Sequence, residues 1–356
     1  MEIYLGLFLI VFLLNNQIIK ISRKIKFTIT SFILFLLVGL RNFKIGTDTQ
    51  NYVNIFNNYN ENPFEVFLSH FPSINIFLSD IGFGMYMYCL KGLGIDAREF
   101  IIITAGISIF LILQFYYKYS KDDLITFFTF ISIGVYIFLF SGIRQGLAIG
   151  IVAFSYTYLI KKKIIKYCFI ILIATSIHAT AIIMFPVYFI VQQKFKLSLK
   201  RLTFLIIMFS FILKEMIYRI IFLSDFNLRI KFYSLSKVTR GSFLIVILYI
   251  FIVIFYLYIN SSQIKKNRII FDKFYYLLLL GLGIYIVSLE HTMLSRFGMY
   301  LYGLVLPVAN SYYIVNIKDV KIRFLCKYCC IFLEMIFFYY VISTDTVFKI
   351  YNYIFF

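Results

Sequence analysis

The sequence contains no tryptophan, and it has only three histidines, four prolines and 16 acidic residues in 356 positions. Charged residues make up 14% of the chain, whereas hydrophobic residues make up 62%. A soluble domain carries roughly 25% charged residues, so this scarcity of charge excludes a soluble globular protein. The hydrophobic residues form long continuous runs, which predict an all-α, polytopic integral membrane protein.

The sequence also lacks the spacings that metal and nucleotide sites use. Neither H-x-x-x-H nor D-x-D occurs, and the G-x-G pairs at 82–84, 92–94 and 281–283 follow no predicted strand. A C-x-x-C-C cluster lies at 326–330, but no histidine is near it. We interpret these cysteines as small residues at a helix start, with reversible acylation as the alternative. The sequence therefore predicts no metal and no cofactor.

The net charge is +19, but the basic residues do not form the single patch of a nucleic-acid-binding protein. They recur in short clusters between apolar runs, which is typical of cytoplasmic loops in membrane proteins. We therefore predict no nucleic-acid partner and expect every cluster to lie in the cytoplasm. The clusters span residues 20–26, 118–121, 161–166, 194–201, 265–273 and 318–327.

Two spans must separate each pair of consecutive cytoplasmic clusters, so the sequence predicts about 12 transmembrane helices with both termini outside. The first apolar run has no basic segment before it and no cleavage site after it, so we expect it to be retained rather than removed as a signal peptide. The predicted spans lie near residues 3–19, 27–40, 99–117, 124–140, 142–160, 164–177, 179–191, 202–220, 242–260, 274–288, 297–316 and 324–343.

One apolar segment, residues 167–191, has the length of a single tilted span but must cross twice to keep the clusters on one side. We predict two short half-spans, broken near His178 and bent again at Pro186. Broken helices are tolerated where they line a cavity rather than face lipid.

The prediction is thus a single transmembrane domain over residues 1–356. Two of its outer loops are long enough to hold structure. They are residues 41–98, with an amphipathic stretch at 64–78, and residues 221–241.

Four polar motifs fall on the predicted outer face. They are R-N-F-K-I-G-T-D-T at 41–49, S-G-I-R-Q-G at 141–146, S-I-H-A-T at 176–180 and H-T-M-L-S-R-F at 291–297. They come from distant parts of the chain, but they share this face, so we expect them to build one composite site.

Three arginines in these motifs, Arg41, Arg144 and Arg296, suit a diphosphate ligand. Apolar runs closely flank Arg144, where a charge costs about 2.5–3.5 kcal/mol on insertion scales. A guanidinium group binds two phosphate oxygens at once, and three converging arginines match the charge of a diphosphate. The alternatives are snorkelling to the interface or an ion pair with Asp48 or Glu290.

Two residues in the motifs are candidates for a catalytic general base. His178 lies at the predicted helix break, and Asp48 lies in the G-T-D-T turn. The alternatives are a packed histidine and an Asx turn or helix cap. We expect Lys44, Thr47 and Gln145, from the same motifs, to bind the phosphates or sugar hydroxyls.

The order of the motifs resembles that of the EpsG family of polysaccharide polymerases, which are related to O-antigen polymerases. The resemblance covers roughly residues 1–310 and rests on R-x-x-x-x-G-T-D-T-x-x-Y (41–52), D-I-G-F-G-M-Y (80–86), I-R-Q-G-L-A (143–148) followed by a span and a KKK loop, S-I-H-A-T-A (176–181) and S-R-F-G-M-Y (295–300). The family pattern has Glu before Gly-Tyr where this chain has Asp80 in D-I-G-F, which keeps the charge but leaves the role of the carboxylate open.

The resemblance implies an inner-membrane glycosyltransferase that joins undecaprenyl-diphosphate-linked oligosaccharide units on the outer face, making O-antigen, capsule or exopolysaccharide. It implies no metal and no nucleotide, and its expected partners are the lipid-linked glycan, membrane lipid and a chain-length regulator. Two other classes are open. A flippase for lipid-linked oligosaccharides would show internal repeats and charges near the midplane, and an acyltransferase would need a histidine-led motif that the first spans lack.

Overall fold

The computed structural model describes residues 2–16, 19–60, 62, 65, 80–133, 135–193, 198–223, 240–263, 268–290, 292–343 and 353. The elements in these residues are all helical. They are α1 (Glu2–Asn15), α2 (Arg23–Gly39), α3 (Thr49–Asn58), α6 (Ile81–Gly92), α7 (Ala97–Tyr119), α8 (Asp123–Ser132), α9 (Val135–Phe138), α10 (Ile143–Ile160), α11 (Ile164–Ile177), η1 (Ala179–Ile183), α12 (Met184–Gln192), α13 (Leu199–Leu223), α15 (Arg240–Gln263), α16 (Arg268–Val287), η2 (Ser288–Glu290), α17 (Thr292–Gly298), η3 (Met299–Gly303), α18 (Leu304–Val315) and α19 (Val320–Ser343).

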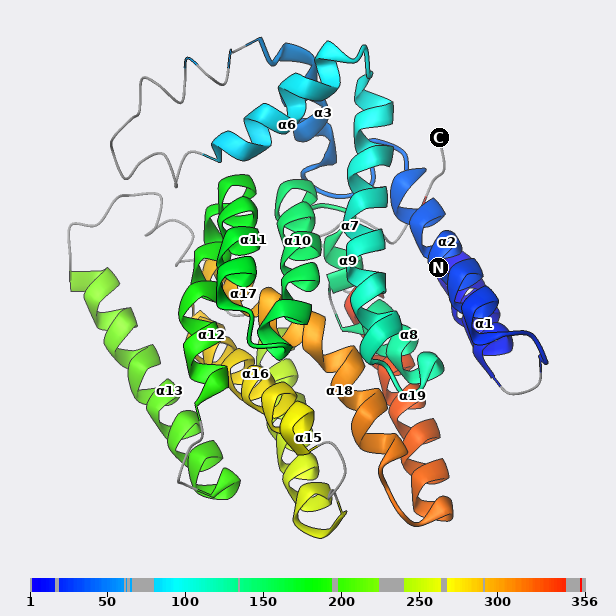
Figure 1. Ribbon diagram of the computed structural model, residues 1–356, viewed down its shortest axis with the longest axis vertical. Coiled ribbons are helices and arrows are strands. Elements are labelled where there is room, and N and C mark those ends of the chain that lie inside the picture. The colour runs from blue at the N-terminus through cyan, green and yellow to red at the C-terminus, as the bar shows by residue number, and fades with distance from the viewer. Residues whose placement is uncertain are drawn as a thin grey trace.

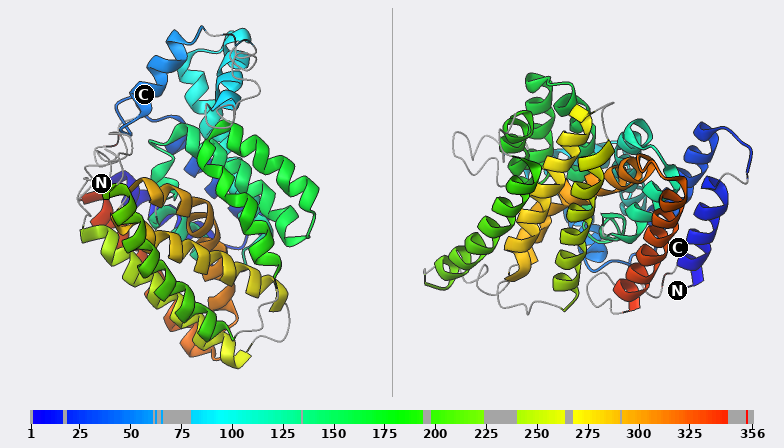
Figure 2. Two further views of the ribbon diagram at one scale, coloured as in Figure 1. Left: turned by 90° about the vertical axis from the view of Figure 1, so that its left-hand side faces the viewer. Right: turned by 90° about the horizontal axis from the view of Figure 1, so that it is seen from below.

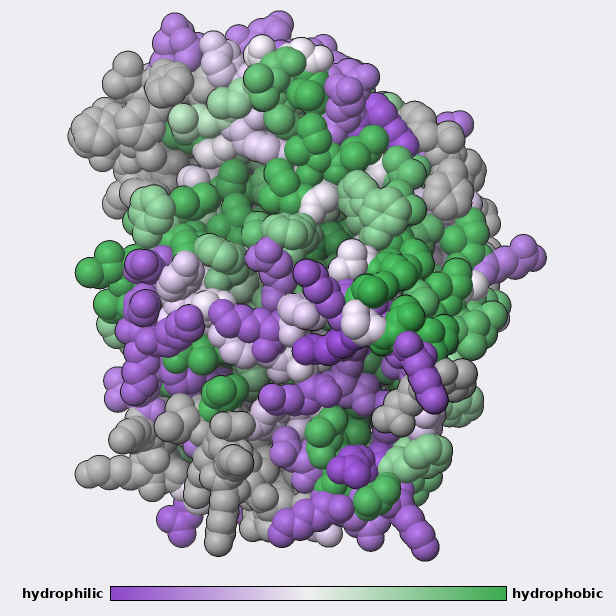
Figure 3. Space-filling view, turned by 45° about the vertical axis from the view of Figure 1, so that its right-hand side comes forward, coloured by the Kyte–Doolittle hydropathy of each residue, from purple (hydrophilic) through white to green (hydrophobic). Residues whose placement is uncertain are grey.

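Three described helices, α7, α10 and α19, are long and apolar enough to cross a membrane. Shorter apolar helices cover residues 2–15, 123–132, 164–177, 179–192 and 249–258. The surface carries a hydrophobic belt between hydrophilic residues at the top and across the lower half (Figure 3). These features indicate a multi-pass membrane protein, while the number of crossings stays a prediction.

Helices occur in all twelve predicted spans, but three of the spans are not single α-helices. The predicted span 179–191 consists of the 3₁₀ helix η1 followed by α12. The predicted span 124–140 consists of two helices, α8 and α9. The predicted span 297–316 begins in α17, passes through the π-helical turn η3 and continues as α18. Pro307 explains this turn, because its ring clashes with the carbonyl group four residues earlier, at Gly303.

The break predicted at His178 is confirmed. Helix α11 ends at Ile177, and His178 has an extended backbone (φ −150°, ψ 114°) before η1 and α12. Helix α12 then returns alongside α11. The hydrogen bond from the Tyr167 hydroxyl in α11 to the Met184 carbonyl in α12, at 2.6 Å, shows this contact. Pro186 lies in the first turn of α12, where its missing N–H removes no helical hydrogen bond.

The basic clusters gather at one end of the helices. Arg23 pairs with Asp123 at 2.7 Å, and Lys327 pairs with the adjacent Asp122 at 2.5 Å. These contacts join the clusters 20–26 and 318–327 to the loop that carries Lys118 and Lys121. The Lys118 ammonium group in turn lies 3.3 Å from the hydroxyl of Thr157, near the end of α10.

The remaining clusters reach the same end. Lys273 donates to the carbonyl of Ile160 at 2.9 Å, and Gln192, the last residue of α12, donates to the carbonyl of Leu159 at 2.7 Å. The first turns of α13 contact α16, where the hydroxyl of Thr203 in α13 lies 2.5 Å from that of Tyr275 in α16. The fold thus supports the assumption that the clusters share one side.

The opposite end is covered by α3 and α6, which belong to the predicted loop 41–98. Figure 1 shows these two helices above the upper ends of α10 and α11, and α6 packs on α11 while α3 packs on α7. The views in Figures 1 and 2 place α13 and the pair α1–α2 on opposite flanks. The amphipathic stretch 64–78 and most of the loop 221–241 lie outside the described residues.

A topology experiment tests which end faces the cytoplasm. Reporters fused after Lys163 or Arg268 are expected to read as cytoplasmic, because short basic loops are retained inside. A reporter fused after Asn51 is expected to read as external. External readings at both basic positions, together with a cytoplasmic reading at Asn51, would reverse the orientation.

Candidate active site

Three side chains meet at the end of the bundle opposite the basic clusters. Nη1 of Arg144 lies 2.6 Å from Oδ2 of Asp80. The other carboxylate oxygen of Asp80 accepts a hydrogen bond from the backbone N–H of Ala179 at 3.1 Å and lies 3.8 Å from Nδ1 of His178. The Asp80 carboxylate therefore lies between the guanidinium group and the imidazole ring.

The D-I-G-F-G motif explains how Asp80 reaches this position. Asp80 precedes α6 with a left-handed backbone (φ 52°), a conformation that Asp tolerates better than most residues. Gly82 then allows α6 to approach the end of α11, because a Cβ at Gly82 would lie 2.2 Å from Oγ of Ser176. This close approach sets the carboxylate beside His178.

The G-T-D-T turn sets the position of Arg144, which lies in the first turn of α10. Gly46 has φ +84°, and a Cβ there would lie 2.0 Å from the carbonyl oxygen of Phe140. The Thr49 hydroxyl donates to the same carbonyl at 2.9 Å. The turn is therefore packed against the residues just before α10, and it fixes where that helix begins.

The same turn brings Thr47 and Asp48 to this end of the molecule. The hydroxyl of Thr47 lies 2.6 Å from that of Ser141, and the Ser141 hydroxyl accepts from the backbone N–H of Asp48 at 3.2 Å. Asp48 precedes α3 without a side-chain capping bond. Its carboxylate has no ion pair within the described part of the chain.

Tyr52, one turn into α3, lies within range of the charged side chains of the site. Burial raises the pKa of its hydroxyl, whereas the positive charges of Arg144 and Arg296 act in the opposite direction. The negative charge of Asp48 adds to the increase. Tyr52 is therefore close to both arginines and to Asp48.

Arg296 reaches the site from α17, which packs against η1. Its carbonyl accepts a hydrogen bond from Nε2 of Gln145 at 2.9 Å, and its charge acts on the ring of His178. Tyr300, in the π-helical turn that follows, lies 2.9 Å from the hydroxyl of Thr180; such turns are frequent at functional sites. Among the described residues, no carboxylate lies within ion-pair distance of Arg296.

The structure buries Arg41 apart from this cluster. Arg41 is only 1% exposed; it donates to the carbonyl of Val38 and lies 3.5 Å from the hydroxyl of Thr49. Burial lowers the pKa of Arg41 to about 9, which leaves it charged at pH 7. Lys44 is exposed on the turn above it. The contacts of Arg41 thus join it to the G-T-D-T turn rather than to Arg144, contrary to the expected convergence of three arginines.

The ion-pair partner of Arg144 also differs from the two that the sequence offered. Asp80 takes this role instead of Asp48. The side chain of Glu290 and all of His291 lie outside the described residues. The sequence patterns left the role of the Asp80 carboxylate open and did not single out Tyr52 or Tyr300, although each of the three stands inside one of the motifs that carry the family resemblance.

The arrangement combines two chemical capacities. Arg144 and Arg296 offer positive charge to an anionic group, and guanidinium groups bind phosphate oxygens in pairs. His178 is 8% exposed, and neither ring nitrogen has a hydrogen-bond partner among the described residues, so no internal hydrogen bond occupies the lone pair of the neutral ring. No group of three or more His, Cys, Asp or Glu that suits a metal ion occurs in the described residues.

Replacing Gly46 with alanine is expected to destabilise the protein by more than the roughly 1–2 kcal/mol of left-handed strain, because its new Cβ would also collide with Phe140. Gly94 provides the matched control, since it has φ +76° but nothing within 4 Å of the position that an added Cβ would occupy. Thermal unfolding of both purified variants checks this. Equal losses would show that the packing of the turn on Phe140 is unimportant.

Comparison with known proteins assigns a family. Neither the curated proteins nor the solved structures contain a significant match to this chain. The model of the EpsG family, which is associated with exopolysaccharide biosynthesis, matches residues 24–355 and so includes every residue of the cluster around Asp80. On this match over most of its length, the chain belongs to the EpsG family.

Proposed function

We propose that the protein is a glycosyltransferase that polymerises undecaprenyl-diphosphate-linked oligosaccharide units on the outer face of the cytoplasmic membrane. The observation that carries the proposal is the cluster of Asp80, Arg144 and His178, with Arg296 beside it. It combines phosphate-binding charge and a proton acceptor at one end of membrane-spanning helices. Membership in a family associated with exopolysaccharide biosynthesis supports the same reaction class.

In the proposed reaction, a hydroxyl of the acceptor sugar attacks the anomeric carbon of the donor glycan. The new glycosidic bond forms while the bond from that carbon to the diphosphate oxygen breaks, and the diphosphate leaves with the bonding electrons. The hydroxyl proton passes to a base. The enzyme lowers the barrier mainly by stabilising the charge on the departing diphosphate, because preorganised donors act strongly where water is excluded.

The side chains have separate roles in this proposal. Arg144 and Arg296 bind the diphosphate, and Gln145 holds the backbone of Arg296 in place. His178 is the preferred base, with Asp48 as the alternative. Asp80 is a positioning residue, because its two oxygens face Arg144 and His178.

Two further residues of the R-N-F-K-I-G-T-D-T motif also fit the proposal. Thr47 and Lys44 are exposed at the same end, where they suit sugar hydroxyls and phosphate. Arg41 supports the turn from below.

The location of the site also fits, because α10 has 18 residues and therefore separates Arg144 from the basic end by about 27 Å, close to the thickness of a hydrocarbon core.

The decisive experiment uses purified protein in liposomes with a lipid-linked oligosaccharide of one repeat. Polymerisation is expected to yield products of two and more repeats, together with free undecaprenyl diphosphate in equal amount to the bonds formed. Transbilayer movement of the unchanged substrate, without longer products, would instead identify the flippase that the sequence left open. In cells, deletion is expected to leave glycans of one repeat per acceptor.

A further inference from the structure

A groove runs along the flank of the molecule between α2 and α7, away from the candidate active site. Its volume is about 920 Å³, and its walls include Lys24, Phe32 and Phe35 on α2 and Gly106, Phe110 and Lys118 on α7. The lining positions recur every three or four residues on each helix, so one face of each helix forms a wall.

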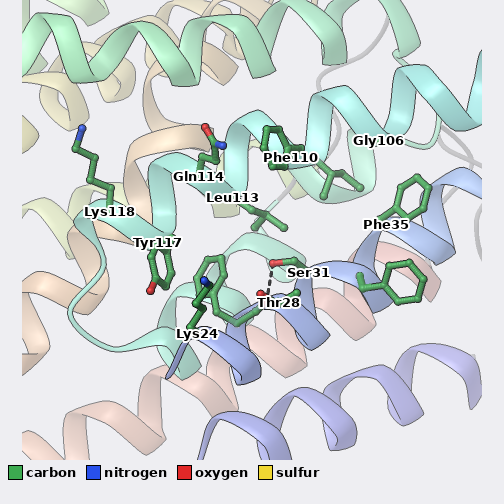
Figure 4. A pocket seen from close by; sticks show the side chains of 13 residues that line it. Lys24, Thr28, Ser31, Phe35, Gly106, Phe110, Leu113, Gln114, Tyr117 and Lys118 are labelled. Atoms are coloured by element: carbon green, nitrogen blue, oxygen red, sulfur yellow. Dashed lines mark hydrogen bonds between the residues drawn. The ribbon is translucent and has the colours of Figure 1, made fainter. Parts of the chain in front are cut away.

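The two ends of the groove differ in polarity. Because α2 and α7 run in opposite directions, Lys24 in the first turn of α2 and Lys118 in the last turn of α7 lie at the same end. Figure 4 shows Lys24 and Lys118 toward one end, with Phe35 and Gly106 at the other. Gly106 lies against Phe35, since a Cβ there would be 3.3 Å from the phenyl ring. Phe110 is 61% exposed, which shows that the apolar part is open along its side.

Positive charge at the polar end is in excess. Lys24 has no carboxylate within ion-pair distance in the described residues, and the nearby Asp123 is occupied by Arg23 at 2.7 Å. The only described hydrogen bond of the Lys118 ammonium is to the neutral hydroxyl of Thr157. The charge of Lys161 also acts on Lys118. An anionic group at this end can therefore approach Lys24 and Lys118 without displacing a described carboxylate from either lysine.

We propose that this groove binds one anionic glycerophospholipid from the leaflet on the basic-cluster side. Its acyl chain lies against Phe32, Phe35 and Phe110, and its phosphate lies between Lys24 and Lys118. Charge complementarity selects this occupant, because basic pockets between membrane helices attract anionic head groups. A zwitterionic lipid offers the same chains without net negative charge. The proposal is independent of the glycan polymerase activity.

The test measures the melting temperature of the full-length protein in mild detergent with added lipid. Phosphatidylglycerol is expected to raise it by a few degrees more than phosphatidylcholine with the same chains, because a ligand that binds only the folded state stabilises it. The double variant Lys24→Gln, Lys118→Gln is expected to lose this difference while keeping the response to phosphatidylcholine. Lys200→Gln is the matched control, an exposed lysine at the same end on α13.

One further compound and one further variant test which part of the lipid the groove binds. Glycerol phosphate without acyl chains is expected to give no shift, and Gly106→Leu, which fills the apolar end, is expected to reduce the shift from both lipids. Equal shifts from the two lipids, or equal losses in Lys200→Gln and the double variant, would overturn the proposal. A larger shift with undecaprenyl phosphate than with phosphatidylglycerol would also overturn it, in favour of a polyprenyl lipid.

Discussion

Replacing Arg144 with lysine is expected to shorten the glycan drastically while the amount of folded protein stays near normal. Lysine keeps the positive charge, so the ion pair with Asp80 at 2.6 Å has a replacement. It loses the planar group that holds a carboxylate on one side and offers donors to a phosphate on another. Removing one donor that stabilises developing negative charge costs roughly 10²–10³-fold in rate, and we expect a loss of this size in liposomes.

Arg23→Lys is the matched control for this substitution. Arg23 also binds an aspartate, with Nε and Nη2 at 2.7 and 2.8 Å from the two oxygens of Asp123, but it lies at the opposite end of the helices. An exposed pair of this kind contributes only about 0–1 kcal/mol, so abundance and chain length should both resemble those of the parent. If Arg144→Lys makes chains as long as the parent at equal abundance, Arg144 does not bind the diphosphate through its guanidinium group.

Replacing His178 with glutamine is expected to reduce the initial rate by about 10²–10⁴-fold, the usual contribution of a general base. Glutamine retains hydrogen-bonding capacity and a similar size, but it does not take up a proton at neutral pH. Asp48→Asn removes the other candidate base and should have a smaller effect. The reverse ranking, measured with the same lipid-linked substrate and with unchanged melting temperatures, would assign the base to Asp48.

Asp80→Asn distinguishes positioning from direct catalysis. Asparagine keeps the shape and an oxygen for the N–H of Ala179, but it no longer neutralises Arg144. We expect the rate to fall less than in His178→Gln. The losses from Asp80→Asn and His178→Gln should also not add in the double variant, because groups that act through one another are non-additive.

The sequence by itself determined the class and the helix positions. Continuous apolar runs of about 20 residues leave helices as the satisfactory way to bond the backbone in lipid, so the predicted spans coincide with helices. It also located the break at His178, because one segment had to cross twice if the basic clusters were to share a side. The contacts of Arg23, Lys273 and Gln192 agree with that assumption.

The sequence also identified the motifs that build the site, but only the tertiary structure decided how their residues pair. Asp80 reaches Arg144 because Gly82 lets α6 touch α11, and neither residue spacing nor charge pattern encodes that approach. Arg41 stands beside Lys44 in the same motif, yet its side chain is buried under the turn that Gly46 packs on Phe140. Ion pairs and burial depend on distances through space between segments far apart in the chain, and those distances are fixed only when the helices pack.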